Sequence, residues 1–170
     1  MKYLYLPKRI GMEHIKFKQV SIEDIYTSII KSTRVIDDRG WTGMQPVARK
    51  RIDTGNEFMD AIGKLLAENC HIRTYELAQS IGVSKAVLNG MLMLFTGMMT
   101  EELLLAYRLM RVKEWLAYTG VSIDEAAARS GFTSQSILGR VFQRKLKTTP
   151  AKYRNTHRPE NFRELYQWEE

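Results

Sequence analysis

Within residues 54–157, apolar side chains recur three or four positions apart, the spacing that gathers them on one face of an α-helix. The longest of these segments spans residues 100–118. Serine or threonine precedes several segments, and Gly82 and Gly131 stand where two of them end, as expected of residues that cap helices. The pattern predicts a mainly helical fold for this part of the chain.

The first 53 residues follow a different pattern. Apolar and polar residues alternate over much of 1–20, on both sides of a turn at 7–11, which predicts a short β-hairpin. Residues 37–53 contain glycine, proline and a basic cluster and are interpreted as a linker. Between them, Ser21 is expected to cap a helix with one apolar stripe, made of Ile22, Ile25, Tyr26, Ile29 and Ile30. The prediction is an N-terminal appendage over 1–53 that holds a short hairpin and one helix.

Two segments about fifty residues apart share one pattern. Three residues separate Ala78 from Gly82, and three separate Ala127 from Gly131. A small alanine lets a second helix cross closely, and glycine supplies the positive φ of a tight turn. Helix-turn-helix units have this composition, and their second helix lies in the major groove of DNA. The repeat therefore predicts two such units, joined by the long helix at 100–118.

The charge balance favours a polyanionic partner. The 170 residues hold 26 Lys and Arg against 19 Asp and Glu, a net charge of +7, which points to nucleic acid first and to an anionic membrane surface second. The basic residues do not line one face of a Leu- and Trp-rich helix, so no membrane partner is expected. The N-terminal apolar stretch is too short for a signal peptide, and a cytoplasmic location is expected.

Catalytic and metal chemistry have no pattern to support them. The single cysteine, Cys70, and three scattered histidines provide neither a disulfide framework nor the spacing of metal ligands. The sequence has no phosphate-binding glycine loop and no nucleophile elbow. We therefore expect a protein that is not an enzyme and that uses no metal and no cofactor.

The chain resembles the DNA-binding domain of the AraC/XylS family of bacterial transcription regulators. The likeness is strongest in the second copy of the repeat, over residues 122–132, 134–142 and 149–154, where Thr149 and Pro150 open the closing signature. It extends over roughly residues 56–155. One departure is Lys147, which stands where the family usually has glycine and bears on the turn after the second recognition helix.

The resemblance implies a mainly α-helical fold of two helix-turn-helix units of three helices each, joined by a linker helix. Its expected parts are a DNA-binding domain at 54–157, with a first unit at 54–99, a linker helix at 100–118 and a second unit at 122–157, and a C-terminal tail or short helix at 158–170. The commonest role in the family is activation of transcription through contact with RNA polymerase. The implied partners are double-stranded DNA and, by resemblance, RNA polymerase, with the chain acting as a monomer or a homodimer.

The second recognition helix carries side chains suited to reading bases. Glutamine can pair bidentately with adenine, and arginine with guanine. By resemblance, the base-facing positions hold Gln135, Ser136, Ile137 and Arg140. The cations expected to contact phosphates around them are Arg144, Lys145, Lys147, Lys152 and Arg154. The alternative is a solvated basic face on a helix with a structural role only.

The first unit has a poorer set. Its DNA-contacting positions by resemblance hold Ser84, Lys85, Ala86 and Asn89, and Gly90 occupies the place that Arg140 fills in the second unit. Residues 54–104 contain three basic and six acidic side chains, whereas residues 121–157 contain seven basic and two acidic ones. Because a net-negative unit is repelled by phosphate, we expect DNA binding mainly through the second unit.

An apolar cluster in the first unit is too large for the core of so small a unit. It consists of Met91, Met93, Leu94, Phe95, Met98 and Met99. We favour an intramolecular cover, in which Ile22, Ile25 and Ile29 of the N-terminal helix pack on it, because that helix also needs a partner. A homodimer or a partner protein is the alternative. The first hypothesis for function is thus a sequence-specific transcription regulator, and the alternative is an adaptor whose first unit docks a partner or a second copy while DNA contact only anchors it.

Overall fold

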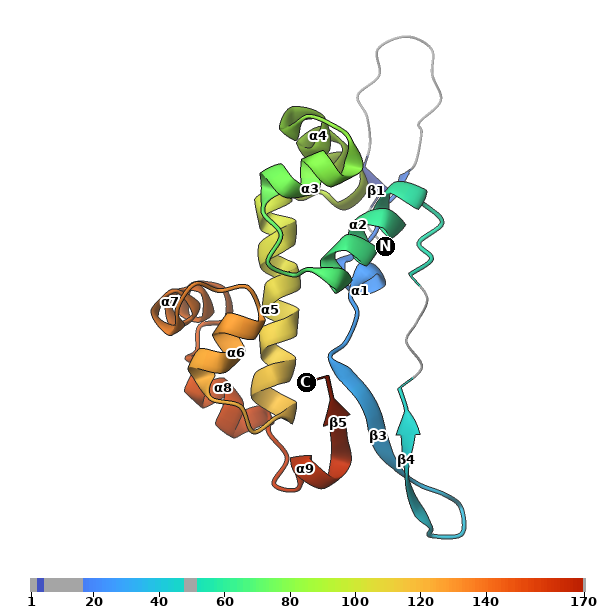
Figure 1. Cartoon of the computed structure of the whole chain (residues 1–170), viewed down its shortest axis with the longest axis vertical. Helices are drawn as coiled ribbons and strands as arrows, with labels where there is room; N and C mark the ends of the chain where they lie inside the picture. The colour runs from blue at the N-terminus through green and yellow to red at the C-terminus, as the bar shows by residue number, and fades with distance from the viewer. Residues whose placement is uncertain (1–2, 5–16, 48–51, 170) are drawn as a thin grey trace. The chain divides into compact units, whose positions relative to one another are not determined.

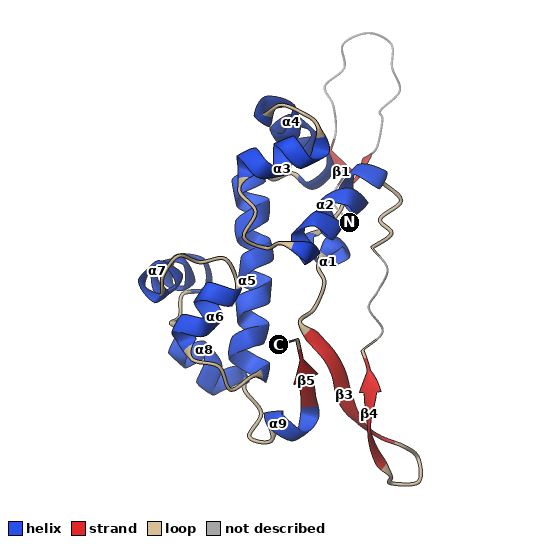
Figure 2. Ribbon diagram, viewed as in Figure 1, coloured by secondary structure: helices blue, strands red, loops and turns tan. Residues whose placement is uncertain are grey.

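The computed structural model describes residues 3–4, 17–47 and 52–169 (Figure 1). They form two compact units. One holds the described residues of Met1–Tyr26 and Ile52–Ala106, and the other those of Thr27–Arg51 and Tyr107–Glu170. Most of both units is helical, with two small antiparallel sheets, so the mainly α fold class is confirmed (Figure 2).

The first unit is built on three helices and the start of a fourth. They are α2 (Glu57–Glu68), α3 (Thr74–Ile81), α4 (Lys85–Thr96) and the beginning of α5 (Thr100–Tyr118). Their facing sides bury a continuous set of aliphatic side chains that includes Met59, Ile62, Leu66, Leu77, Leu88, Leu92 and Leu103. This core holds α3 and α4 in place as a helix-turn-helix pair, bent by 88° where they meet.

The N-terminal helix is shorter than the sequence predicts. Strands β1 (Tyr3–Leu4) and β2 (Phe17–Lys18) pair antiparallel, as expected of the hairpin, and the predicted turn at 7–11 lies outside the described residues. Helix α1 then runs only from Ile22 to Ile25, so the prediction of one helix that also carries Ile29 and Ile30 is wrong. The cause is the run of β-branched residues that follows, which favours a strand over a helix.

The second unit contains the rest of α5 together with α6 (Ile123–Arg129), α7 (Gln135–Leu146) and α8 (Pro150–His157). Its core is more aromatic than that of the first unit. The buried side chains include Tyr107, Trp115, Leu116, Ala127, Leu138 and Phe142. Pro150 opens α8 as predicted, and the hydroxyl of Thr149 accepts a hydrogen bond from the N–H of Lys152 at 3.2 Å.

A three-stranded sheet completes the second unit. It consists of β3 (Ile30–Ile36), β4 (Thr42–Pro46) and β5 (Tyr166–Trp168), in the antiparallel order β4-β3-β5, with the short helix α9 (Phe162–Leu165) leading into β5. The predicted linker at 37–53 therefore contains a strand, and the predicted tail at 158–170 contains both a short helix and a strand. The local sequence pattern does not identify either strand, because each forms only by pairing with β3. In the case of β5, the partner β3 is also far away in the sequence.

A carboxylate on α5 anchors the start of this sheet. Glu114 accepts hydrogen bonds from the hydroxyl of Ser28 at 2.9 Å and from the N–H of Ile29 at 3.0 Å. One turn earlier on α5, Arg111 pairs with Glu169, whose own N–H donates to the carbonyl of Ile29 at 3.0 Å. The segment before β3 and the residue after β5 are thus joined to the same helix by charged groups, and Ile29 is fully buried.

Replacement of Glu114 by alanine is expected to destabilise the second unit. The change leaves the Ser28 hydroxyl and the Ile29 N–H without their acceptor, which should lower the free energy of unfolding by about 1–3 kcal/mol. Urea denaturation followed by circular dichroism measures this loss. Glu160→Ala, at an exposed position, is the matched control and should change little; equal effects of the two substitutions would contradict the anchoring role.

Candidate nucleic-acid interface

The two helix-turn-helix units have the same turn. Gly82 and Gly131 both adopt positive φ, 78° and 82°. After each glycine, the next N–H reaches back to the alanine carbonyl, Val83 to Ala78 and Phe132 to Ala127, both at 3.0 Å. Both alanines are buried, as the close crossing of the helices requires. The repeat read from the sequence is therefore a repeat of backbone geometry.

Both recognition helices also begin in the same way. The hydroxyl of Ser84 accepts a hydrogen bond from the N–H of Val87 at 3.3 Å, and that of Ser134 accepts one from the N–H of Ile137 at 3.2 Å. Each serine thus caps a helix whose first turn faces solvent. Because the backbones agree, any difference in binding between α4 and α7 must come from their exposed side chains.

Helix α7 presents a polar face with cations along it. Leu138, Val141 and Phe142 are buried in the unit. The predicted base-facing residues on the other side are all exposed: Gln135, Ser136, Ile137 and Arg140. Gln143, which was not among the predicted residues, is also exposed and lies one turn beyond Arg140 on the same face. The three-residue step from Arg140 is the signal that could have identified it.

Five of the predicted phosphate-contacting and base-reading cations surround this face. Arg140, Arg144, Lys145, Lys147 and Lys152 are all exposed, from α7 to the first turn of α8. The two remaining basic residues of 121–157 serve inside the unit. Arg129 forms an ion pair with Glu125 at 2.8 Å and lies over the ring of Trp115. The exposed cations of residues 121–157 thus all lie on the recognition helix or shortly after it.

Arg154 differs from the other predicted phosphate contacts. Its guanidinium donates to the carbonyl of Val121 at 2.6 Å and is half-buried. Burial lowers the pKa of Arg154 from its ordinary value, and the nearby charge of Arg158 lowers it further. The side chain joins α8 to the segment before α6, so we leave it out of the candidate interface.

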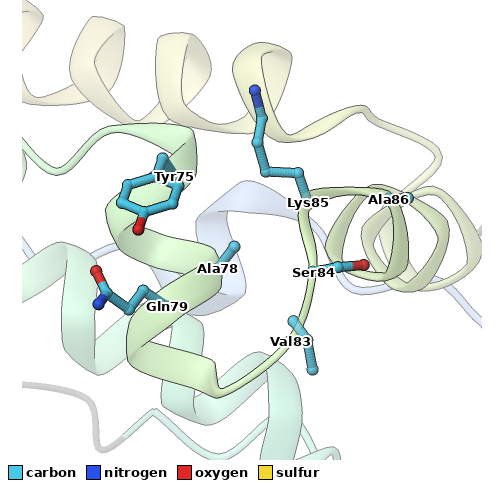
Figure 3. A pocket seen from close by; sticks show the side chains of 7 residues that line it. All are labelled: Tyr75, Ala78, Gln79, Val83, Ser84, Lys85 and Ala86. Atoms are coloured by element: carbon cyan, nitrogen blue, oxygen red, sulfur yellow. The ribbon is translucent and has the colours of Figure 1, made fainter.

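The exposed face of α4 is chemically different from that of α7. Its solvent-facing positions hold Ala86, Val87, Gly90 and Met93, with Lys85 at the start. A shallow groove of about 580 Å³ lies between α3 and the beginning of α4 (Figure 3). Of the seven described residues that line it, only Lys85 is charged. This surface offers one cation where the second unit offers five.

Asn89, a predicted DNA contact, has a structural role within the first unit. Its side-chain carbonyl accepts hydrogen bonds from the N–H of Thr100 at 3.1 Å and from the hydroxyl of Thr100 at 2.6 Å. Thr100 is fully buried and begins α5. The amide therefore caps the linker helix, and its oxygen is not free for a base.

The segment before α1 and a ring of α2 contact the apolar cluster of the first unit. Ile25 packs against α2, where a Cβ on Gly63 would lie 3.1 Å from the Cβ of Ile25, and Ile29 belongs to the second unit. Ile22, Ile25 and Ile29 therefore do not form one stripe that covers the cluster together. Instead, the N–H of Val20 donates to the carbonyl of Phe95 at 2.8 Å, and the Phe95 ring lies 5.9 Å from that of Phe58.

Part of the apolar cluster remains at the surface. Met91, Leu94, Phe95 and Met98 are half-buried, whereas Met93 and Met99 are 40% and 42% exposed. Cys70 is buried next to this unit's core. Within the described residues, no single helix is long and apolar enough to cross a membrane, and α3 with α4 meets the length and composition criteria only as a bent pair.

Lys147 adopts the conformation that glycine has in the first unit. Gly97 ends α4 with a φ of 72°, and Lys147 ends α7 with a φ of 55°. Lys147 is the one non-glycine residue with positive φ in the described chain. The turn after the second recognition helix is thus formed in spite of the lysine, which puts its cation at the C-terminal end of α7.

Comparisons with known proteins support a helix-turn-helix assignment. Residues 77–156 match the family described as a helix-turn-helix domain. The DNA-binding domain of AdpA, a global transcriptional factor solved in complex with a target DNA, is 25% identical, with a TM-score of 0.55 over 58% of this chain and 90% of that chain. The C-terminal domain of AraT, a response regulator from Geobacillus stearothermophilus, is 23% identical, with a TM-score of 0.54 over 58% and 84%.

An AraC-type regulator from Chromobacterium violaceum is 23% identical, with a TM-score of 0.52 over 58% of this chain and 89% of that chain. The comparison with curated proteins finds no match. The fold is that of a tandem helix-turn-helix DNA-binding domain. The resemblance to AraC/XylS-type DNA-binding domains seen in the sequence agrees with the helix-turn-helix match and with the folds of these solved structures.

Replacement of Lys147 by glycine is expected to stabilise the protein. A left-handed conformation costs a residue with a Cβ about 1 kcal/mol, and glycine removes that cost. The free energy of unfolding, measured by urea denaturation, should rise by about this amount. Lys145→Gly removes the same charge from within α7, where glycine is unfavourable, and should lower stability instead. A destabilised Lys147→Gly variant would contradict this explanation.

Proposed function

We propose that the protein is a sequence-specific transcription regulator that reads the major groove of DNA mainly through α7. The observation that carries the proposal is the contrast between two helices with the same turn and the same cap. The exposed face of α7 holds Gln135, Arg140 and Gln143, whereas that of α4 holds Ala86, Val87 and Gly90. Only the first set has the donors and acceptors that distinguish base pairs.

Base reading and phosphate binding are divided among different side chains in this proposal. Arg140, in the middle of the exposed face of α7, is placed to pair with a guanine, and Gln135, near its start, with an adenine. Lys145 in the last turn of α7, Lys147 directly after it and Lys152 in the first turn of α8 are assigned to phosphates. Such a regulator acts where the DNA of a bacterial cell is, in the cytoplasm.

The first unit contributes little to non-specific affinity in this proposal. Its local charge is negative, and Lys85 is the one cation at the start of α4. Counterion release scales with the number of phosphates that cations neutralise, so this unit adds little to it. The DNA complex of the AdpA domain supports the general mode of binding, since that domain is similar to this one over more than half of the chain.

Arg140→Ala is expected to weaken binding to the preferred DNA site by about 1–3 kcal/mol and to relax the preference at one base pair. The site is first selected from a random pool of duplexes, and the dissociation constants for it and for each single-base variant are then measured by fluorescence anisotropy. Unchanged affinity and unchanged preference would contradict the assignment of α7.

The matched control for this prediction is Lys152→Ala. Lys152 is exposed in the first turn of α8 and is assigned to a phosphate, so its loss should weaken all duplexes alike. The slope of log affinity against log salt should become shallower by about 1. A loss confined to one sequence would instead make Lys152 a base-reading residue.

A second function is favoured by the apolar surface of α4. Val87 is 50% exposed and Met93 is 40% exposed, with Gly90 between them on the same helix. A protein helix can approach closely at glycine, and exposed aliphatic side chains are typical of a docking surface. We propose that the first unit docks a partner protein while the second holds DNA; by family resemblance, RNA polymerase is the first partner to test.

Met93→Lys separates docking from DNA reading. The substitution places a charge on the exposed apolar face of α4 and should reduce transcription from a template bearing the selected site without changing affinity for that site. Purified RNA polymerase and anisotropy provide the two readouts. Lower DNA affinity with unchanged transcription per bound molecule would contradict docking by this face.

A further inference from the structure

Strand β4 is an open edge of the three-stranded sheet. In the described part of the chain, β4 pairs with β3 on one side only. The N–H of Asp37 donates to the carbonyl of Trp41 at 2.9 Å, and the N–H of Val47 donates to the carbonyl of Lys31 at 2.8 Å. Bonding groups alternate along a strand, so Thr42 and Met44 direct their N–H and C=O groups away from β3.

The hairpin formed by β3 and β4 exposes large apolar side chains near this edge. Trp41 is 77% exposed, Ile36 is 68% exposed, and Val35 and Met44 are each 38% exposed. Every residue of β4 is exposed, and none of them carries a charge. Natural edge strands are commonly protected by charged side chains, and this one lacks that protection although it ends in Pro46.

We propose that this edge is a homodimer interface in which β4 pairs antiparallel with β4 of a second copy, with Met44 at the two-fold axis. Two three-stranded sheets would then form one continuous sheet of six strands. The proposal concerns association of the protein itself, and it does not rest on the DNA-reading role of α7.

The backbone hydrogen-bonding pattern of β4 fits this register better than a register shifted along the strand. With Met44 opposite Met44 of the second copy, the outward groups of the two residues satisfy each other in a pair of hydrogen bonds. Thr42 then lies opposite Pro46 of the second copy, and its N–H meets the proline carbonyl. Pro46, which has no N–H, falls at the end of the ladder, where the missing donor interrupts least.

Side chains also match across the proposed axis. Ile36 is paired with Thr42, so Ile36 and Met44 share one face of the sheet, and the axis brings the apolar groups of both copies together on it. On the other face of the sheet, Trp41 would lie opposite Val47 of the second copy. Within that copy, Val47 is the cross-strand neighbour of Lys31, so Lys31 lies on the same face. The most exposed apolar side chain of the hairpin thus gains an apolar neighbour and a cation beside its ring.

Charge complementarity favours a second copy of the chain as the occupant. The tip of the hairpin holds Asp37, Asp38 and Arg39, a net negative end, whereas the opposite end of the hairpin has the exposed Lys31. Antiparallel pairing places the acidic tip of one copy beside the basic end of the other. No two like charges face each other along the uncharged β4 strands.

The location of the edge is compatible with binding of DNA by both copies. Within the second unit, the hairpin and α7 lie on opposite sides of α5 (Figure 1). Pairing at β4 therefore leaves α7 of each copy uncovered. A dimer formed in this way would carry two copies of α7 related by a two-fold axis, which matches a symmetric DNA site.

The test measures self-association of the full chain without DNA by sedimentation velocity over a range of concentrations. The wild-type protein should show a concentration-dependent dimer. Met44→Lys places two like charges at the axis and removes the two methionine side chains that the dimer would bury. Dimerisation should weaken by about tenfold or more. Met44→Glu should behave in the same way, and an equimolar mixture of the two variants should recover the dimer.

Gln45→Lys is the matched control. It adds the same charge one residue away, on the opposite face, where Gly43 of the second copy leaves room, and should retain the dimer. A wild-type chain that stays monomeric at all concentrations overturns the proposal, as does a dimer that Met44→Lys leaves intact. Circular dichroism and DNA affinity of the Met44→Lys monomer show whether the second unit is still folded. If Met44→Lys has unfolded, Met44→Glu takes its place, and a folded Met44→Glu chain that still forms the dimer also overturns the proposal.

Discussion

The close crossing of two helices over a buried alanine is the constraint on which both units depend. Ala78 and Ala127 have side chains small enough for the following helix to lie directly on them, and Gly82 and Gly131 supply the positive φ that turns the chain back at that point. Any larger group at either alanine would separate the helices and lose the core between them. Because both units meet this constraint with the same backbone bonds, α4 and α7 are presented to solvent in the same way.

On this shared scaffold the two units have different surfaces. Between residues 121 and 157 of the second unit, the internal basic residues Arg129 and Arg154 hold the structure together, and the exposed cations at α7 and the start of α8 can face an anionic partner. In the first unit, Asn89 caps α5 and Gly90 leaves a gap in the helix surface, so few polar groups remain for DNA. A unit that keeps the helix-turn-helix backbone while losing its polar face is well suited to contact protein rather than nucleic acid.

The sheet gives the second unit a property that the helical domain alone does not have. Strands β3 and β5 come from opposite ends of the chain and dock on α5 through Glu114 and Arg111. The docking leaves β4 as an edge, with its outward backbone groups and apolar side chains at the surface. The same sheet that ties the chain ends to the domain therefore also creates a surface for association.

The sequence by itself determined the helical region, the two turns and the exposed face of α7, because helix periodicity, capping residues and glycine turns are local and repeat at a constant offset. It did not determine the roles of Ile29, Asn89 and Arg154, nor the strands at 42–46 and 166–168. Ile29 continues a helical spacing but directly precedes β3, the strand that pairs with β5, and Asn89 and Arg154 are polar residues whose partners lie in other elements. Only the tertiary structure decides such cases, because a hydrogen bond or a strand pair between distant segments leaves no periodic trace in either one.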